Sequence, residues 1–269
     1  MTAVVLAGGR GSRLRASSPD GLASDAQRRA ALRGLKIMMP VDAAGRRPLL
    51  DYILGSLADA GVSEVVLVVP PEAAEVRDHV ARTPPARLAV RFAVQAVADG
   101  TAGAVLAAEA AVTDPAFLVM NGDNLYPPSA VRALCALESC GLPAFTRASL
   151  LTASGFPPGK IDTFADVTAD AAGWLVRLVE KPARGPGAPE RSALVSMNIW
   201  KLDRTIFEAA RDVPPSPRGE RELPGAVMLA VTRGTPFRVL AVSEPVLDLT
   251  TADDVALVSR ALAGVEPRP

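Results

Sequence analysis

Residues 4–15 read VVLAGGRGSRLR, an apolar run that passes into glycines and then into closely spaced arginines. The run 4–6 predicts a short strand that is buried on both faces. The glycines free the backbone so that its N–H groups can approach a ligand, and arginine guanidinium groups match phosphate oxygens. The stretch therefore predicts a first strand followed by a polyphosphate-binding loop, with an ordinary tight turn and solvated arginines as the alternative.

Two well-known phosphate loops do not fit these residues. A P-loop ends in Gly-Lys-Ser/Thr, whereas Gly11 is followed by a serine and an arginine. A dinucleotide-binding loop needs a third glycine, whose place Leu14 takes, and an acidic residue at the end of the second strand, where the sequence has Pro70-Pro71. The loop therefore belongs to another class of phosphate site.

Strand-like and helix-like patterns alternate over the first half of the chain, which predicts right-handed crossovers and parallel strands. The predicted strands are 4–6, 64–69, 88–95, 117–121, 143–147, 166–168, 174–179, 194–202 and 237–242. The predicted helices are 48–60, 72–82, 101–112, 129–139, 205–210, 223–232 and 252–263. We expect an α/β fold with a Rossmann-like, mostly parallel sheet flanked by helices and a smaller mixed lobe. It forms a single domain over residues 1–269, with halves at about 1–150 and 151–250 and a C-terminal helix.

Composition narrows the class of protein. The 269 residues include 29 Lys+Arg and 29 Asp+Glu, so the charge balance favours neither nucleic acid nor a membrane surface as a partner. The apolar runs are too short to span a membrane, and a strand that starts at residue 2 leaves no room for a signal peptide. We therefore expect a cytoplasmic protein.

Lysine and histidine are both scarce. The lysines are Lys36, Lys160, Lys181 and Lys201, in a chain that otherwise uses arginine. A lysine kept in such a chain indicates a need for a compact ammonium, and this points to Lys36 and Lys181. The single histidine, His79, lies on a predicted surface helix as a solvated residue, so a mechanism that needs a histidine base is disfavoured.

Polar residues follow several predicted strands, at the sheet edge where such folds bind ligands. Gln95 ends the third strand and precedes Gly100 and Thr101; its amide can pair with a planar base, or the segment is a polar loop before a capped helix. Asp123, in NGDN, and Asp248, in VLDLTT, also follow apolar runs. Desolvated carboxylates need a cation, although a turn aspartate and a loop carboxylate are the alternatives.

Two carboxylates from separate strands, a glycine–arginine loop and sparse lysines predict Mg²⁺-assisted phosphoryl or nucleotidyl transfer. The lack of a histidine base fits this chemistry. A phosphate monoester, with a second pKa of about 6, is already a competent nucleophile near neutral pH.

A series of motifs, in order along nearly the whole chain, resembles those of the sugar-1-phosphate nucleotidyltransferase (nucleotide-sugar pyrophosphorylase) family. They are LAGGRGSRLR, LKIMMPV with the following GRRPLLDYIL, the segment from Gln95 to Thr101, NGDN, LVEKP, SMNIW and LDLTT. The resemblance implies Mg²⁺-dependent transfer of a nucleotidyl group from an NTP to a sugar 1-phosphate, giving an NDP-sugar and pyrophosphate. The half at about 1–150 would bind the nucleotide, and the half at about 151–250 the sugar phosphate.

The resemblance also implies site residues. The implied catalytic residues are Arg13, Lys36 and Asp123, and the implied metal ligands are Asp123 and Asp248. The implied nucleotide-binding residues are Leu6, Ala7, Gly8, Gly9, Gly11, Gln95, Gly100 and Thr101. The implied sugar-phosphate-binding residues are Asn124, Glu180, Lys181 and Asn198.

Several features depart from the family pattern. The polar segment Ala16–Gly34, a predicted loop, is longer than usual; it is either a lid whose Arg28, Arg29 or Arg33 reaches the phosphates, or a surface insertion. Gly225 stands where many relatives carry an acidic residue, so the resemblance does not assign that part of the sugar-phosphate-binding half. The appended β-helix of some relatives is not expected.

Other readings of the function remain open. A catalytically silent nucleotide-sugar-binding regulatory protein on the same fold is the main alternative. Such a protein need not keep all of Arg13, Lys36, Asp123, Lys181 and Asp248, and this chain has all five. Glycosyl transfer would predict a D-x-D motif, which NGDN followed by Leu125 lacks. Gly103, at the start of the helix after Gln95, leaves room for a larger base, which favours GTP, then dTTP or UTP, over ATP. The sugar and a homo-oligomeric state are not decided by the sequence.

Overall fold

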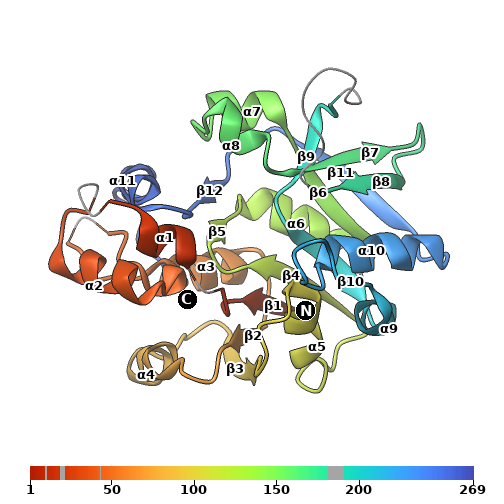
Figure 1. The fold of residues 1–269 in the computed structure, drawn as a ribbon. Helices are drawn as coiled ribbons and strands as arrows, with labels where there is room; N and C mark the ends of the chain where they lie inside the picture. The colour runs from red at the N-terminus through yellow and green to blue at the C-terminus, as the bar shows by residue number, and fades with distance from the viewer. Residues whose placement is uncertain (10, 19–21, 43, 181–190) are drawn as a thin grey trace.

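The computed structural model describes residues 1–9, 11–18, 22–42, 44–180 and 191–269. Its centre is a ten-stranded sheet in the order β3-β2-β1-β4-β10-β6-β9-β7-β8, with β11 paired to β6 (Figure 1). The strands are β1 (Thr2–Leu6), β2 (Glu64–Val69), β3 (Ala89–Val94), β4 (Ala116–Asn121), β6 (Cys140–Thr146), β7 (Ala165–Ala169), β8 (Leu175–Val179), β9 (Leu194–Ser196), β10 (Ile199–Asp203) and β11 (Phe237–Val242). A separate two-stranded sheet joins β5 (Asn124–Leu125) to β12 (Leu247–Asp248).

The predicted α/β architecture is confirmed. Strands β3, β2, β1 and β4 are parallel neighbours, and β10 then runs antiparallel between β4 and β6. The remaining antiparallel ladders join β6 to β9, β9 to β7 and β7 to β8, so the mixed part of the sheet lies in the second half of the chain.

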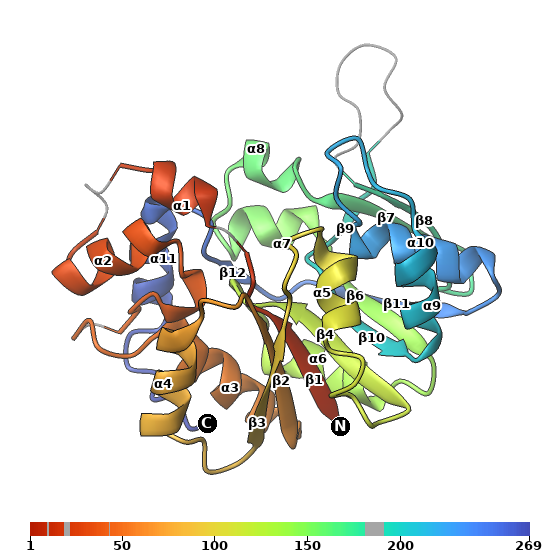
Figure 2. The ribbon, with the colours of Figure 1, turned by 60° about the horizontal axis from the view of Figure 1, so that its bottom comes forward.

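Helices cover both faces of the sheet (Figure 2). They are α1 (Ser12–Ala16), α2 (Asp25–Arg33), α3 (Leu49–Asp59), α4 (Ala74–Arg82), α5 (Thr101–Ala107), α6 (Pro128–Ala136), α7 (Arg147–Thr152), α8 (Pro158–Ile161), α9 (Thr205–Asp212), α10 (Leu223–Thr232) and α11 (Ala252–Ala261), with a 3-10 helix at Lys36–Met38. Successive side chains of a strand point to opposite faces, so Ala3 and Val5 pack with α3 and α11, whereas Val4 packs with α5, α9 and α10. No helix among these described residues is long and apolar enough to cross a membrane.

Apart from shifts in bounds, such as the predicted helix 101–112 that ends at Ala107, two predicted segments differ in kind from the structure. The predicted strand 194–202 is broken, because β9 pairs with β6 and β7 whereas β10 pairs mainly with β4. Asn198 turns the chain between them with φ of 58°, a left-handed conformation that asparagine tolerates better than most residues. The segment Ala16–Gly34 is not a plain loop, since it contains α2. That helix begins with a capping box between Ser24 and Gln27, which satisfies two backbone donors at its first turn.

The C-terminal end of α2 lies against the backbone of the glycine-rich loop. Gly11 has a φ of 58°, and a Cβ atom on it would lie 2.2 Å from the carbonyl oxygen of Gly34. Only glycine tolerates both this conformation and this approach. The contact brings the loop after β1 beside the residue pair that leads into Lys36.

Two arginines of the inserted segment, Arg28 and Arg33, have partners away from the glycine-rich loop. Arg28 donates to Asp25 and to the carbonyl of Leu22, and Arg33 is paired with Glu75 on α4. Their partners tie α2 to itself and to α4, which favours the surface insertion over the phosphate lid for Arg28 and Arg33.

Asp166 forms the centre of an ion-pair cluster in the mixed half of the sheet. Its carboxylate lies 2.6 Å from the guanidinium of Arg147 and 2.7 Å from that of Arg191. Burial alone would raise the pKa of Asp166, but hydrogen bonds from Arg191 and Arg147 hold it below its ordinary value. The charged form is therefore the one that the folded state stabilises.

We expect Asp166→Asn to lower the free energy of unfolding at pH 7 by about 2–3 kcal/mol, because two partly buried guanidinium groups lose their nearer counter-charge and keep only the more exposed Asp162. The difference between wild type and variant should shrink as pH falls below the ordinary pKa of an aspartate, since the wild-type carboxylate is then protonated on unfolding. Urea titrations at pH 7 and pH 3.5 measure this. Asp212→Asn is the control, because Asp212 pairs with Arg233 on the surface and should cost less than about 1 kcal/mol.

Candidate active site

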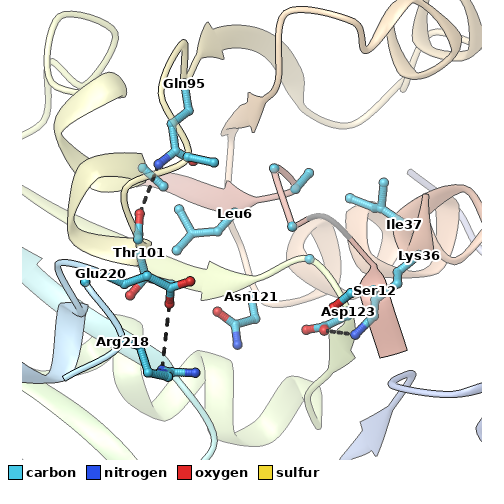
Figure 3. A pocket seen from close by; sticks show the side chains of 18 residues that line it. Leu6, Ser12, Lys36, Ile37, Gln95, Thr101, Asn121, Asp123, Arg218 and Glu220 are labelled. Carbon is cyan, nitrogen blue, oxygen red and sulfur yellow. Dashed lines mark hydrogen bonds and ion pairs between the residues drawn. The ribbon is translucent and has the colours of Figure 1, made fainter. Parts of the chain in front are cut away.

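A cavity of about 550 Å³ opens at the carboxyl ends of β1, β3 and β4. Parallel α/β sheets bind ligands at this edge, and the volume suits a nucleotide. The cavity is lined by Leu6, Ala7, Gly8, Gly9, Ser12, Lys36, Ile37, Gln95, Ala98, Gly100, Thr101, Ala104, Asn121, Gly122, Asp123, Arg218, Gly219 and Glu220. Figure 3 shows its two ends, with Gln95 and Thr101 on one side and Lys36 and Asp123 on the other.

The first end is built around Gln95. The backbone N–H of Gln95 donates to the carbonyl of Val69 at the end of β2, so the residue is held by the sheet. Gly100 follows with φ of 117°, and a Cβ on it would lie 2.2 Å from the carbonyl oxygen of Arg221. The N–H of Leu223 donates to the Thr101 hydroxyl at 2.8 Å, and the N–H of Ala102 donates to Arg221. The loop before α10 is therefore fixed against the turn that precedes α5.

The second end is an ion pair. The Lys36 ammonium lies 2.8 Å from the Asp123 carboxylate, and both side chains are partly buried. Lys36 comes from the 3-10 helix that follows α2, whereas Asp123 follows β4. Each group thus holds the other at the rim where phosphates would enter.

Asp248 lies behind Asp123 rather than on the cavity wall. Strands β5 and β12 pair Asn124 with Asp248, and the N–H of Leu249 donates to the carbonyl of Asp123. The Asn124 amide donates to one carboxylate oxygen of Asp248 at 3.2 Å, and the Thr250 hydroxyl donates to the other at 2.8 Å. The second carboxylate is therefore buried but fully hydrogen-bonded.

Lys160 on α8 supplies the counter-charge for Asp248. Its ammonium lies 2.8 Å from Asp248 and 2.7 Å from Asp254 at the start of α11. Burial, and then the negative charge of Asp123, raise the pKa of Asp248 despite this ammonium. Two neighbouring carboxylates thus need more positive charge than the lysines give them.

The donor set fits a hard divalent cation that completes its shell with substrate oxygens. The described residues contain no cluster of three or more His, Cys, Asp or Glu side chains that could hold a metal alone. Mg²⁺, however, is usually bound through one or two carboxylates together with phosphates and waters. Asp123, in the turn before β5, and Asp248, on β12 beside β5, would provide those carboxylates.

The structure brings most of the predicted nucleotide-binding residues to one place. Gly8, Gly9, Gln95 and Thr101 line the cavity together with Leu6, Ala7 and Gly100. Gly11 is buried and Arg13 is exposed on α1, and neither lines the cavity.

The predicted sugar-phosphate residues are more dispersed. Asn124 is buried with its amide on Asp248, and Asn198 is joined to the end of β4 through its carbonyl, which accepts from Asn121. Glu180 directly follows β8 and is partly buried. Lys181 lies outside the described residues.

The cavity residues on the loop between α9 and α10, and Lys160, were not predicted. Arg218, Gly219 and Glu220 lie on the loop between α9 and α10, with the Arg218 guanidinium 3.8 Å from the Glu220 carboxylate. No periodic pattern or motif used above covers that loop. Lys160, in contrast, shares the scarcity that pointed to Lys36, so that signal could have found it.

The interpretation of Gly103 was wrong. An ideal Cβ on Gly103 would lie 1.8 Å from a carboxylate oxygen of Asp99. The space left by the missing side chain is occupied by Asp99 and is not available to a larger base. The preference for GTP loses this support.

A nucleotide-sized cavity with an amide at one end and an ammonium–carboxylate pair at the other has groups that a phosphate-group transferase would use. The chain belongs to the nucleotidyl transferase family, whose model, described as "Nucleotidyl transferase", matches residues 33–244. Like its named relatives it is an enzyme, a nucleotidyltransferase of the sugar-1-phosphate type.

Individual relatives agree with this assignment. The chain is 30% identical over 269 residues to a glucose-1-phosphate thymidylyltransferase of Streptomyces antibioticus, covering 100% of this chain and 68% of that protein. It is 29% identical over 227 residues to the bifunctional protein GlmU of Methanocaldococcus jannaschii, covering 84% of this chain but 46% of that protein. A solved structure of UDP-glucose pyrophosphorylase with UDP-glucose shares the fold, with a TM-score of 0.75, 17% identity and 97% of each chain covered.

Proposed function

We propose that the protein catalyses Mg²⁺-dependent transfer of a nucleotidyl group from an NTP to a sugar 1-phosphate, forming an NDP-sugar and pyrophosphate. The observation that carries the proposal is one continuous cavity in which Gln95 lies at one end and the Lys36–Asp123 pair at the other. If the base of the NTP binds the Gln95 amide, the triphosphate of the NTP would lie along Gly8 and Gly9. The α-phosphate would then reach the charged end.

In the proposed reaction a phosphate oxygen of the sugar 1-phosphate attacks the α-phosphorus of the NTP. The new P–O bond forms as the bond from the α-phosphorus to the oxygen that bridges to the β-phosphate breaks, and the electron pair leaves with pyrophosphate. Positioning and charge neutralisation are sufficient for such a step, since the nucleophile is already an anion. Lys36 would neutralise charge on the phosphates, and Arg13 would turn toward them from α1.

The acceptor would be held by groups of the second half. By resemblance, Glu180 and Asn198 would contact sugar hydroxyls and Lys181 the sugar phosphate. In this proposal Asn124 orients the metal ligand Asp248 and does not contact the sugar phosphate, because its amide already donates to Asp248. Arg218 and Glu220, on the wall of the same cavity, are further candidates for contact with substrate.

Asp123 and Asp248 would hold the metal. When bound, a divalent ion neutralises charge on the α-phosphate and on the leaving pyrophosphate. In the structure Lys36 is paired with Asp123, and Lys160 with Asp248 and Asp254. When the metal binds, Lys36 would be released toward phosphate oxygens, and Lys160 would remain paired with Asp254.

The chain's single histidine plays no part in this scheme. His79 on α4 lies 2.7 Å from the carboxylate of Asp51 on α3 and is largely buried there, which corrects the expectation of a solvated residue. It does not line the cavity.

Pyrophosphate release over a matrix of nucleotides and sugar phosphates tests the proposal. GTP, dTTP, UTP, CTP and ATP would each be combined with the 1-phosphates of glucose, galactose, mannose and N-acetylglucosamine, with Mg²⁺ or with excess EDTA. We expect release that needs both substrates and stops with EDTA. Release without a sugar phosphate would indicate simple NTP hydrolysis, and no release with any pair would contradict the proposal for these acceptors.

A further inference from the structure

The Gln95 amide is oriented by two neighbours, of which Asp99 does not line the cavity and Gly100 does. Its Nε2 atom lies 3.2 Å from an Asp99 carboxylate oxygen and 3.0 Å from the carbonyl oxygen of Gly100. Both partners are acceptors only, so the group that faces them must be the NH₂ group of the amide. Its two N–H bonds are thereby used.

The amide oxygen is then the part of Gln95 that remains for a ligand. A Cβ placed on Gly8 would lie 3.2 Å from this oxygen, and Gly8 lines the cavity. The oxygen therefore lies over the glycine-rich loop, on the cavity side (Figure 3). An amide held in this way offers one function, which is to accept a hydrogen bond.

Asp99 is itself fixed in place. Its N–H donates to the carbonyl of Val97, and its carbonyl accepts from the N–H of Arg221 at 2.7 Å. Its carboxylate fills the space above Gly103, where a Cβ would lie 1.8 Å away. The glycine at 103 and the aspartate at 99 thus form a matched pair, and a side chain at 103 would displace the carboxylate from Gln95.

We propose that Asp99 is a specificity-determining residue that acts through Gln95, selecting nucleotides whose base presents a ring N–H to the amide oxygen. Uracil and thymine offer N3–H and guanine offers N1–H, whereas cytosine N3 and adenine N1 are acceptors. An acceptor facing the fixed oxygen leaves both groups without a partner in a partly desolvated site. The inference rests on the proposed function, since it assumes that the base lies at this end of the cavity.

UTP and CTP are the matched probes, because their bases have the same size and differ at the ring nitrogen and its neighbouring substituent. We expect calorimetric titration of the wild-type protein with Mg²⁺ to show UTP binding about ten- to a hundredfold more tightly than CTP. Equal affinities for the two nucleotides, or no binding of either, would overturn the proposal.

Two variants test the role of the Asp99 carboxylate from different sides. Asp99→Ala removes it, and Gly103→Ala displaces it while leaving Asp99 in the chain. In each, only the Gly100 carbonyl still holds the NH₂ group, so the amide can turn this group toward the cavity more easily, and the ratio of UTP to CTP affinity should fall about fivefold. Asp99→Asn, whose side-chain oxygen can still accept from Gln95, should keep most of the ratio.

The double variant Asp99→Ala/Gly103→Ala completes the cycle. If Gly103 matters only because Asp99 occupies its space, the ratio of UTP to CTP affinity should be the same in the double variant as in Asp99→Ala alone. A purely structural role would weaken UTP and CTP binding by the same factor and leave the ratio unchanged. Thermal melting of each variant confirms the fold. Because these titrations need no sugar phosphate, they can fail while pyrophosphate release succeeds, and the reverse.

Discussion

Asp123→Asn should lower kcat for pyrophosphate release by about a thousandfold or more, and Asp248→Asn should do the same. A metal ion that neutralises charge in the transition state contributes several kcal/mol, and about 4 kcal/mol corresponds to three decades in rate. An asparagine keeps the shape of each side chain but removes the negative charge that would bind the ion. Steady-state kinetics at saturating Mg²⁺, with melting curves for each variant, measure the effect.

Asp253→Asn is the matched control for these two variants. Asp253 is exposed in the first turn of α11, beside Asp254, so the same substitution there should leave kcat unchanged. Full activity of either Asp123→Asn or Asp248→Asn would exclude a metal held by two carboxylates. Recovery of activity at much higher Mg²⁺ would instead show that the lost carboxylate served mainly to bind the ion.

Lys36→Met should lower kcat by about two to three decades, with a smaller change in KM for the NTP. Losing a charge-assisted contact to a phosphate in a water-poor site costs roughly 2–4 kcal/mol, and the contact strengthens as charge moves toward the leaving pyrophosphate. In the free enzyme the Lys36 ammonium is held by Asp123, so its removal also leaves that carboxylate without its partner.

Arg82→Met controls for the loss of a positive charge as such, since Arg82 is exposed in the last turn of α4. It should leave both kinetic constants unchanged. A change confined to KM in Lys36→Met would mean that the lysine binds ground state and transition state equally, and would remove it from the catalytic residues.

The sequence predicted the elements that have strong periodic patterns. The bounds of β2, β11 and α10 agree with the predicted 64–69, 237–242 and 223–232. Where it failed, the cause was tertiary pairing or an overlooked cap. The break at Asn198 depends on which strands lie on either side, which a single apolar run cannot show. The capping box of α2 was visible as Ser24 and Gln27, three residues apart, and was missed.

The site shows the same division. Residues that directly follow strands, such as Gln95 and Asp123, could be placed at the cavity from sequence because strand ends gather at one sheet edge. Arg218 and Glu220 could not, because hydrogen bonds to residues far away in the sequence, Asp99, Thr101 and Ala102, hold their loop at the cavity. The interpretation of Gly103 failed since the residue that fills its space lies four positions earlier in the chain.

Strand β10 also limits how the enzyme can move. It shares five residue pairs with β4 and is bonded to β6 on its other side, so a hinge rotation between the halves would break main-chain ladders. We therefore expect opening and closing to come from segments outside the sheet. Loop motions take nanoseconds to microseconds, whereas domain rotations take microseconds to milliseconds. We expect the release of products to need a local rearrangement at the cavity mouth and no rotation of the halves.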